Sequence, residues 1–130
     1  MMNIVDSSGW LEYFAGGENA AYFTPAIEDL SNLLVPVICI YEVFKRVLFL
    51  YGLDAAEIRM ADLFKGEIIE LDASLAMSAA RISVDRQLPM ADSFLLAAAR
   101  NYHATLWTQD EHFKNIEAVK YIEKKHRSQS

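Results

Sequence analysis

The sequence predicts an α/β sandwich in which a short, mainly parallel central sheet is flanked by helices. Short β-branched runs alternate with longer stretches of helical periodicity, the pattern of parallel strands joined through helices. Hydrophobic residues make up 53% of the chain and charged residues 23%, which is typical of a globular protein and excludes a disordered one. With 130 residues we expect one domain, over residues 1–124, followed by a polar tail at 125–130.

The first half of the chain is expected to alternate strands and helices. The predicted elements are a strand at 3–5, helices at 10–14 and 19–33, a short strand at 34–37 and a helix at 38–51. Pro25 should break or restart the helix at 19–33, because proline lacks the amide hydrogen that an inner helical turn needs. Glycines at 16–17 and at 52 are suited to end helices.

The second half continues the same alternation. The predicted elements are a helix at 54–65, a strand at 68–71, a helix from 72 to about 87, a helix at 92–102, a strand at 104–108 and a last strand at 119–122. Asp54 and Asp72 are placed to cap the helices that they begin. The helix at 92–102 is apolar on most sides and should be deeply packed.

Acidic residues recur at comparable positions in these units. Asp6 and Asp110 follow predicted strands, Glu42 lies early in the helix after the second strand, and Asp92 begins the apolar helix. Residues that follow different parallel strands gather along one edge of the sheet. These acids are therefore the candidate site.

Each acid also has a structural explanation when it is taken alone. A helix cap explains Asp6 or Asp92, and a turn explains Asp110. Glu42 could pair with Lys45 or Arg46, one turn further along its helix. Against these alternatives, Glu42 and Asp92 stand in the apolar contexts ICIYEVF and PMADSFLLAAA, where a carboxylate needs a cationic partner to offset desolvation.

Clustered carboxylates repel one another and raise each other's pKa unless a positive ion neutralises them. Oxygen ligands without cysteine or clustered histidine select Mg²⁺ or Mn²⁺ over zinc. One or two such ions could activate water and stabilise the charge on a phosphodiester. The residues thus favour hydrolysis without a protein nucleophile.

The sequence resembles the PIN-domain ribonucleases and, among them, the VapC-type toxins of bacterial and archaeal toxin–antitoxin pairs. The likeness covers nearly the whole chain and rests on the ordered motifs NIVDSSGWLEYF, YEVFKRV, LPMADSFLLAAAR and LWTQDEHF. The resemblance implies a PIN-like nuclease domain at residues 1–124. It also implies that the catalytic residues hold Mg²⁺, with Mn²⁺ as a possible substitute, and orient water for endonucleolytic RNA cleavage; these are Asp6, Glu42, Asp92 and Asp110.

The resemblance extends to two hydroxyl residues. Ser7 would help to position metal or phosphate, and Thr108 would form a hydrogen bond that ties the edge of the site together. Both hydroxyls could instead form local turn bonds. Many relatives cap the helix of the second acid with Ser or Thr, whereas this chain has the sequence PVIC at residues 36–39. Glu111, next to the last acid, is not included in the predicted site.

Charge and apolar residues suggest the partners. Twelve Lys and Arg against eighteen Asp and Glu give a net charge of −6, which excludes a wholly cationic surface for nucleic acid. Local cations are the candidate RNA contacts, with Arg86 preferred, although none is assigned as a binding residue: Lys45, Arg46, Arg81, Arg86 and Arg100. The aromatic-rich first helices suit core packing or an association surface, and the resemblance implies a homodimer and a cognate antitoxin.

Two other functions stay open on the residues alone. One is a phosphatase or phospho-acceptor domain with Asp6 as the nucleophile, although position 8 carries no second acid and the chain has no GxxxxGK[ST] loop. The other is a catalytically silent PIN-like binding scaffold. The single cysteine, Cys39, and the lack of a signal-like start or a bilayer-spanning run lead us to expect a cytoplasmic protein that does not enter membranes.

Overall fold

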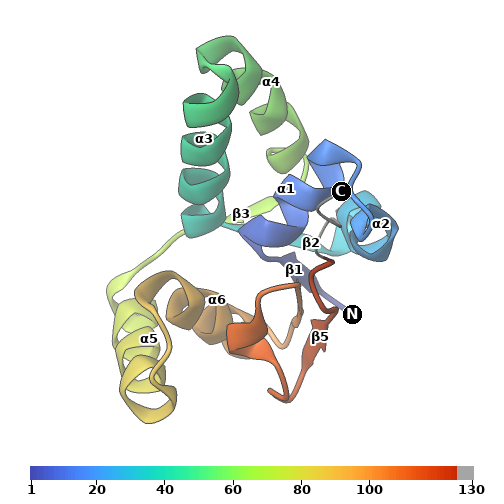
Figure 1. The fold of residues 1–130 in the computed structure, drawn as a ribbon. Helices are drawn as coiled ribbons and strands as arrows, with labels where there is room; N and C mark the ends of the chain where they lie inside the picture. The colour runs from blue at the N-terminus through green and yellow to red at the C-terminus, as the bar shows by residue number, and fades with distance from the viewer. Residues whose placement is uncertain (126–130) are drawn as a thin grey trace.

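The fold of the chain was obtained as a computed structural model that describes residues 1–125 (Figure 1). All strands pair in parallel in one 5-stranded sheet of order β3-β2-β1-β4-β5. The strands are β1 (Asn3–Val5), β2 (Leu33–Pro36), β3 (Glu67–Ile69), β4 (Thr105–Thr108) and β5 (Val119–Tyr121). The predicted α/β class is confirmed, and the predicted tail at 125–130, apart from Lys125, lies outside the described residues.

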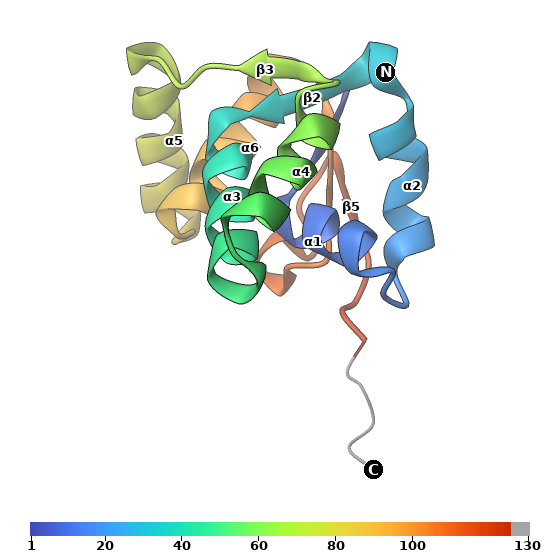
Figure 2. The same cartoon turned by 90° about the horizontal axis from the view of Figure 1, so that it is seen from above.

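Helices cover both faces of this sheet. Their bounds are α1 (Ser7–Ala15), α2 (Ala20–Glu28), α3 (Val37–Tyr51), α4 (Leu53–Leu63), α5 (Ala73–Arg86) and α6 (Met90–Asn101), with short 3-10 turns η1 (Leu30–Asn32) and η2 (Glu111–Phe113). Figure 1 shows α1 to α4 on one side of the strands and α5 and α6 on the other, and Figure 2 shows α2 and α5 at opposite ends of the molecule. Within residues 1–125, no helix is long and apolar enough to cross a membrane.

The central strand β1 is buried on both faces and divides the core into two layers. Val5 packs with Trp10 and Phe23 under α1 to α4, whereas Ile4 packs with Leu95 and residues of α5 and α6. Successive side chains of a strand point to opposite faces, which explains why neighbouring residues join different layers. An apolar strand without alternation is the pattern expected of a parallel strand covered on both sides.

The predicted helix at 19–33 is too long. It ends at Glu28 and is followed by η1 and by β2, which begins at Leu33. The Asp29 carboxylate accepts hydrogen bonds from Asn32 Nδ2 at 3.0 Å and Ser31 Oγ at 3.4 Å. These short polar side chains stabilise a turn in competition with the helix, which frees the apolar residues after it for the sheet.

Two predictions about single residues in helices are wrong, and a third is confirmed. Pro25 lies inside α2 instead of breaking it. Because proline has no amide hydrogen, the carbonyl of Ala21 loses its helical partner, but both residues are exposed and water can form a hydrogen bond to that carbonyl. Gly52, not Asp54, precedes α4, and Asp54 lies within the first turn, where a negative charge favours the helix dipole. Asp72 does cap α5, because its side chain accepts the amide hydrogen of Leu75 at 2.8 Å.

Candidate active site

The candidate acids are all placed at the carboxyl edge of the parallel sheet. Asp6 directly follows β1, and Asp110 lies two residues after β4, the strand that pairs with β1. Glu42 lies in the second turn of α3, which begins where β2 ends, and Asp92 lies in the first turn of α6. Sequence positions more than one hundred residues apart therefore meet at one edge of the sheet.

Serines at the start of α1 connect Asp6 to Glu42. The Ser7 hydroxyl oxygen lies 3.1 Å from Glu42 Oε1 and 3.3 Å from Asp6 Oδ1, and Ser8 Oγ donates to Asp6 Oδ2 at 3.1 Å. The Ser7 hydroxyl carries one proton and can donate to only one of the two carboxylates at a time. The other carboxylate needs a proton or a cation to offset the repulsion.

Thr108 connects Asp6 to Asp110. Its buried hydroxyl donates to Asp6 Oδ2 at 2.8 Å and accepts the amide hydrogen of Asp110 at 2.9 Å. The first bond spans two strands and the second is a local turn bond, so both interpretations of Thr108 hold. The predicted hydrogen bond across the edge of the site is confirmed.

His112 connects Asp110 to Asp92. Its Nδ1 lies 2.9 Å from Asp92 Oδ2 and 3.2 Å from Asp110 Oδ1, and its amide donates to Asp110 Oδ1 at 3.0 Å. The partner of the buried Asp92 is therefore an imidazole. His112 is not among the predicted site residues. Its place two residues after Asp110 is evident in the sequence, but nothing in the sequence shows its contact with a helix twenty positions earlier.

Burial and mutual repulsion perturb the acids. Burial and the neighbouring Asp110 raise the pKa of Asp92 to about 6, and burial also raises the pKa of Asp6 and of Glu42. The charge of Asp6 raises the pKa of Glu42 further. The hydrogen bond to Asp92 raises the pKa of His112 above its ordinary value. The electrostatic conflict expected of clustered carboxylates is present.

The structural alternatives account for little of this arrangement. Asp6 stands before α1 but its side chain makes no capping bond, and Pro89, not Asp92, precedes α6. In the described part of the chain, Glu42 forms no ion pair with the cations one turn further along α3. Asp110 does serve a turn, because it caps η2 as well as contacting the His112 ring.

The donor set fits a divalent cation. One ligand atom each from Asp92, Asp110 and His112 lie within 4.8 Å of one another, and the carboxylates of Asp6 and Glu42 join this group through Ser7 and Thr108. Carboxylate oxygens are the usual ligands of Mg²⁺ and Mn²⁺. A histidine nitrogen, Nδ1 of His112, lies beside these carboxylate oxygens.

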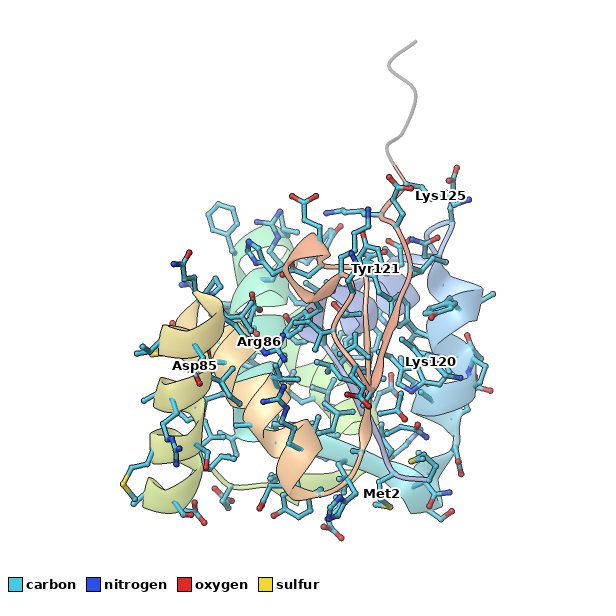
Figure 3. The ribbon with its side chains drawn as sticks, turned by 90° about the horizontal axis from the view of Figure 1, so that it is seen from below. Met2, Asp85, Arg86, Lys120, Tyr121 and Lys125 are labelled. Atoms are coloured by element: carbon cyan, nitrogen blue, oxygen red, sulfur yellow. The ribbon has the colours of Figure 1, made fainter. Side chains whose placement is uncertain are left out.

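A groove beside Glu42 carries two of the candidate cations. It has a volume of about 570 Å³ and is lined by Tyr41, Glu42, Lys45, Arg46, Leu48 and Phe49. Arg86 lies exposed in the last turn of α5 (Figure 3). Arg81 and Arg100 line a separate hollow between α5 and α6 that none of the candidate acids lines.

The sequence matches one protein family over most of its length. Residues 4–119 match the PIN domain family. The chain belongs to this family. The match runs from within β1 to the first residue of β5 and includes every candidate acid. The sequence has no match among curated proteins.

Several solved structures share this fold over most of the chain. A toxin–antitoxin complex from Klebsiella pneumoniae contains a chain that superposes with a TM-score of 0.76 at 21% identity, covering 90% of this chain and 94% of that one. VapC20 from Mycobacterium tuberculosis, described as a sarcin–ricin loop cleaving toxin, gives a TM-score of 0.72 at 17% identity over 88% and 95%. VapBC2 from Rickettsia felis, bound to a promoter DNA fragment, gives 0.72 at 14% identity over 96% and 100%. At these identities the likeness establishes a common fold.

Proposed function

We propose that this PIN-domain protein is a metal-dependent endoribonuclease and the toxin of a type II toxin–antitoxin pair, with its nuclease domain at residues 1–124. The observation that carries the proposal is the continuous chain of contacts that joins the acids: Glu42, Ser7, Asp6, Thr108, Asp110, His112 and Asp92. Family membership and the fold shared with a toxin that cleaves the sarcin–ricin loop support the same conclusion.

Asp6, Glu42, Asp92 and Asp110 would hold Mg²⁺, with Mn²⁺ as a possible substitute. When bound, such an ion lowers the pKa of water and stabilises negative charge on a phosphodiester. The chain's own residues prepare the site for it. Ser8 and Thr108 fix Oδ2 of Asp6, which leaves Oδ1 on the side of Ser7 and Glu42.

The RNA backbone must approach an acidic site on a protein of net charge −6. Lys45 and Arg46 line the groove next to Glu42, where they can attract phosphates toward the acids without filling the site themselves. Lys45 also lies over the Tyr41 ring, 5.5 Å from its centre, which holds the ammonium at the groove. This groove is the proposed approach of the RNA.

We also propose an antitoxin partner and self-association, both in the cytoplasm. Large apolar side chains are exposed on α3 and α4, among them Phe49 at 79% and Ile58 at 67%. Exposed apolar clusters of this kind mark protein interfaces. The similar structures from Klebsiella and Rickettsia are themselves complexes with a partner protein or with DNA.

The phosphoryl-transfer alternative is less well supported. Asp6 is 3% exposed, its Oδ2 accepts two hydrogen bonds and its Oδ1 lies 3.3 Å from the Ser7 hydroxyl oxygen, which leaves little room for in-line attack on a phosphorus atom. Incubation with a phosphoryl donor such as acetyl phosphate separates the alternatives. Labelling of Asp6 would support a phospho-acceptor and count against the nuclease.

The nuclease proposal is tested with purified protein and end-labelled RNA. Cleavage should require Mg²⁺ or Mn²⁺ and disappear in the Asp6→Asn and Asp92→Asn variants. The matched control is Glu57→Gln, which neutralises an exposed acid on α4 and should retain full activity. Cleavage that persists in excess chelator would exclude the metal mechanism, and metal binding without cleavage of any RNA would favour the silent scaffold.

A further inference from the structure

The proposed function uses His112 only as a contact between Asp92 and Asp110 and gives its imidazole no role toward the metal. We infer that His112 is a ligand of the bound ion and that its imidazole raises the affinity of the site for a transition-metal ion such as Mn²⁺ relative to its affinity for Mg²⁺. This inference rests on the proposed metal site and adds a specificity-determining residue to it.

Two distances from the His112 ring match those between adjacent ligands of one ion. Nδ1 of His112 lies 2.9 Å from Asp92 Oδ2 and 3.2 Å from Asp110 Oδ1. Adjacent ligands of an octahedral ion with bonds of about 2.1 Å stand about 3 Å apart. A hydrogen bond produces a similar distance, so the test must separate coordination from hydrogen bonding.

The ring is held at this position by its surroundings. The His112 amide donates to Asp110 Oδ1, and the Asp110 amide in turn donates to buried Thr108. The next residue, Phe113, is fully buried and anchors η2 in the core. The His112 side chain itself is 52% exposed, so an ion can enter beside it without a change in core packing.

The chemistry of the donor set gives the direction of the selectivity. Mg²⁺ prefers oxygen ligands and gains little from an imidazole, whereas transition-metal ions accept both carboxylate and imidazole. His112 should therefore raise the affinity for Mn²⁺ and leave the affinity for Mg²⁺ almost unchanged. Carboxylates alone already bind Mn²⁺ somewhat more tightly, so the informative quantity is the change in the Mn²⁺ to Mg²⁺ affinity ratio on substitution.

The experiment measures Mn²⁺ binding by EPR of the free ion and Mg²⁺ binding by competition, for the whole chain and its variants. His112→Ala should lower the Mn²⁺ to Mg²⁺ affinity ratio by about tenfold or more, since even residues that only support a metal ligand change affinity by that factor. His112→Asn keeps a donor near the position of Nδ1 but supplies no imidazole, and the same loss is expected. The control His103→Asn removes another histidine, at a left-handed position (φ 52°) that asparagine tolerates, and should leave the ratio unchanged.

Pulsed EPR of the Mn²⁺-loaded protein gives a second readout. Wild-type protein should show a ¹⁴N coupling from a directly bound imidazole, and His112→Ala should lack it. A normal ratio in His112→Asn, or no ¹⁴N coupling in the wild type, would overturn the inference and assign His112 to hydrogen bonding alone. If that result accompanies Mg²⁺-dependent RNA cleavage, the proposed function stands; if the wild type binds neither ion, both fall together.

Discussion

Thr108 shows how one side chain can organise a site whose parts are far apart in the sequence. Its hydroxyl is fully buried; it donates to the Asp6 carboxylate just after β1 and accepts the Asp110 amide hydrogen just after β4. A buried polar group that loses its partner costs about 1–3 kcal/mol. The consequences of removing this hydroxyl should therefore appear in both stability and activity.

Thr108→Val retains the shape of the side chain and removes both hydrogen bonds. We expect the free energy of unfolding to fall by about 1–3 kcal/mol and RNA cleavage to fall with it, because Asp6 and Asp110 lose the group that holds them in register. Denaturant unfolding and a cleavage assay measure the two effects. The control is Thr105→Val, in the same strand, because the Thr105 side chain forms no hydrogen bond to another residue in the described structure. This variant should change neither the free energy of unfolding nor RNA cleavage. A stable Thr108→Val protein would show that the Thr108 contact is dispensable.

The charged carboxylate of Asp92 is expected to destabilise the metal-free protein. Its charged form is disfavoured by burial and by Asp110, which is why its pKa is raised to about 6. Asp92→Asn should leave the metal-free Tm unchanged or raised, and it should abolish the increase in Tm that Mg²⁺ produces in the wild type. Thermal melts in chelator and in Mg²⁺ test this prediction, with Glu57→Gln as the control; a clear loss of metal-free stability would show that the carboxylate is a structural residue.

At the scale of the element, α1 presents Ser7 and Ser8 to the acids, and a glycine sets how closely it packs. A Cβ at Gly9 would lie 2.7 Å from Val5 Cγ1 and from Phe23 Cδ1, closer than packed atoms allow. The absence of a side chain thus lets α1 approach both β1 and α2.

Gly9→Ala should destabilise the protein by about 1–3 kcal/mol, because the added methyl group overpacks the core. Phe23→Leu makes room at the same place, so the double variant should lose less stability than the sum of the two single variants. Denaturant unfolding of the four proteins completes the cycle. Additive losses would show that the helix adjusts without contacting Phe23.

Some elements of the fold follow from neighbouring residues alone, and others depend on contacts between distant segments. The strand at 3–5, the Asp72 cap and the end of α3 near Gly52 follow from neighbouring residues and were predictable. The end of α2 was missed because the Asp29 turn competes with the helix, and Pro25 was tolerated because of its exposure. His112 was missed because its contact with Asp92 exists only after η2 and α6 have packed together.

The whole molecule leaves apolar surface exposed on α3 and α4, in the layer opposite α5 and α6. We expect wild-type protein to self-associate and Ile58→Glu to shift the mass measured by light scattering toward the monomer, because a buried charge at an interface is strongly unfavourable. Its Tm at low concentration should not change. The control is Met77→Glu, which makes an equally drastic change at an exposed apolar residue of α5. Equal effects of both variants would indicate general aggregation instead of a defined interface.

The pH dependence of stability reports the state of the site as a whole. A carboxylate whose pKa is raised on folding binds more protons in the native state than in the unfolded state, so stability falls as pH rises from its ordinary pKa of 3.8 toward the folded value of about 6 for Asp92. Burial acts in the same direction on Asp6 and Glu42. The raised pKa of His112 adds stability that is complete below its ordinary pKa of 6.5 and is lost as pH rises through the folded value.

These contributions have the same sign, so the metal-free protein should be more stable at pH 5 than at pH 8, and Asp92→Asn should reduce that difference. Divalent ions bind the deprotonated acids, so the rise in Tm on adding Mg²⁺ should instead grow between pH 5 and pH 8. Melts across this range in chelator and in excess Mg²⁺ measure both trends. A metal site requires that the stability of the metal-free protein and the rise in Tm on adding Mg²⁺ change with pH in opposite directions. The reason is that the repulsion between the acids, which destabilises the metal-free protein, is the interaction that the bound ion relieves. Parallel slopes would mean that the acids do not act together.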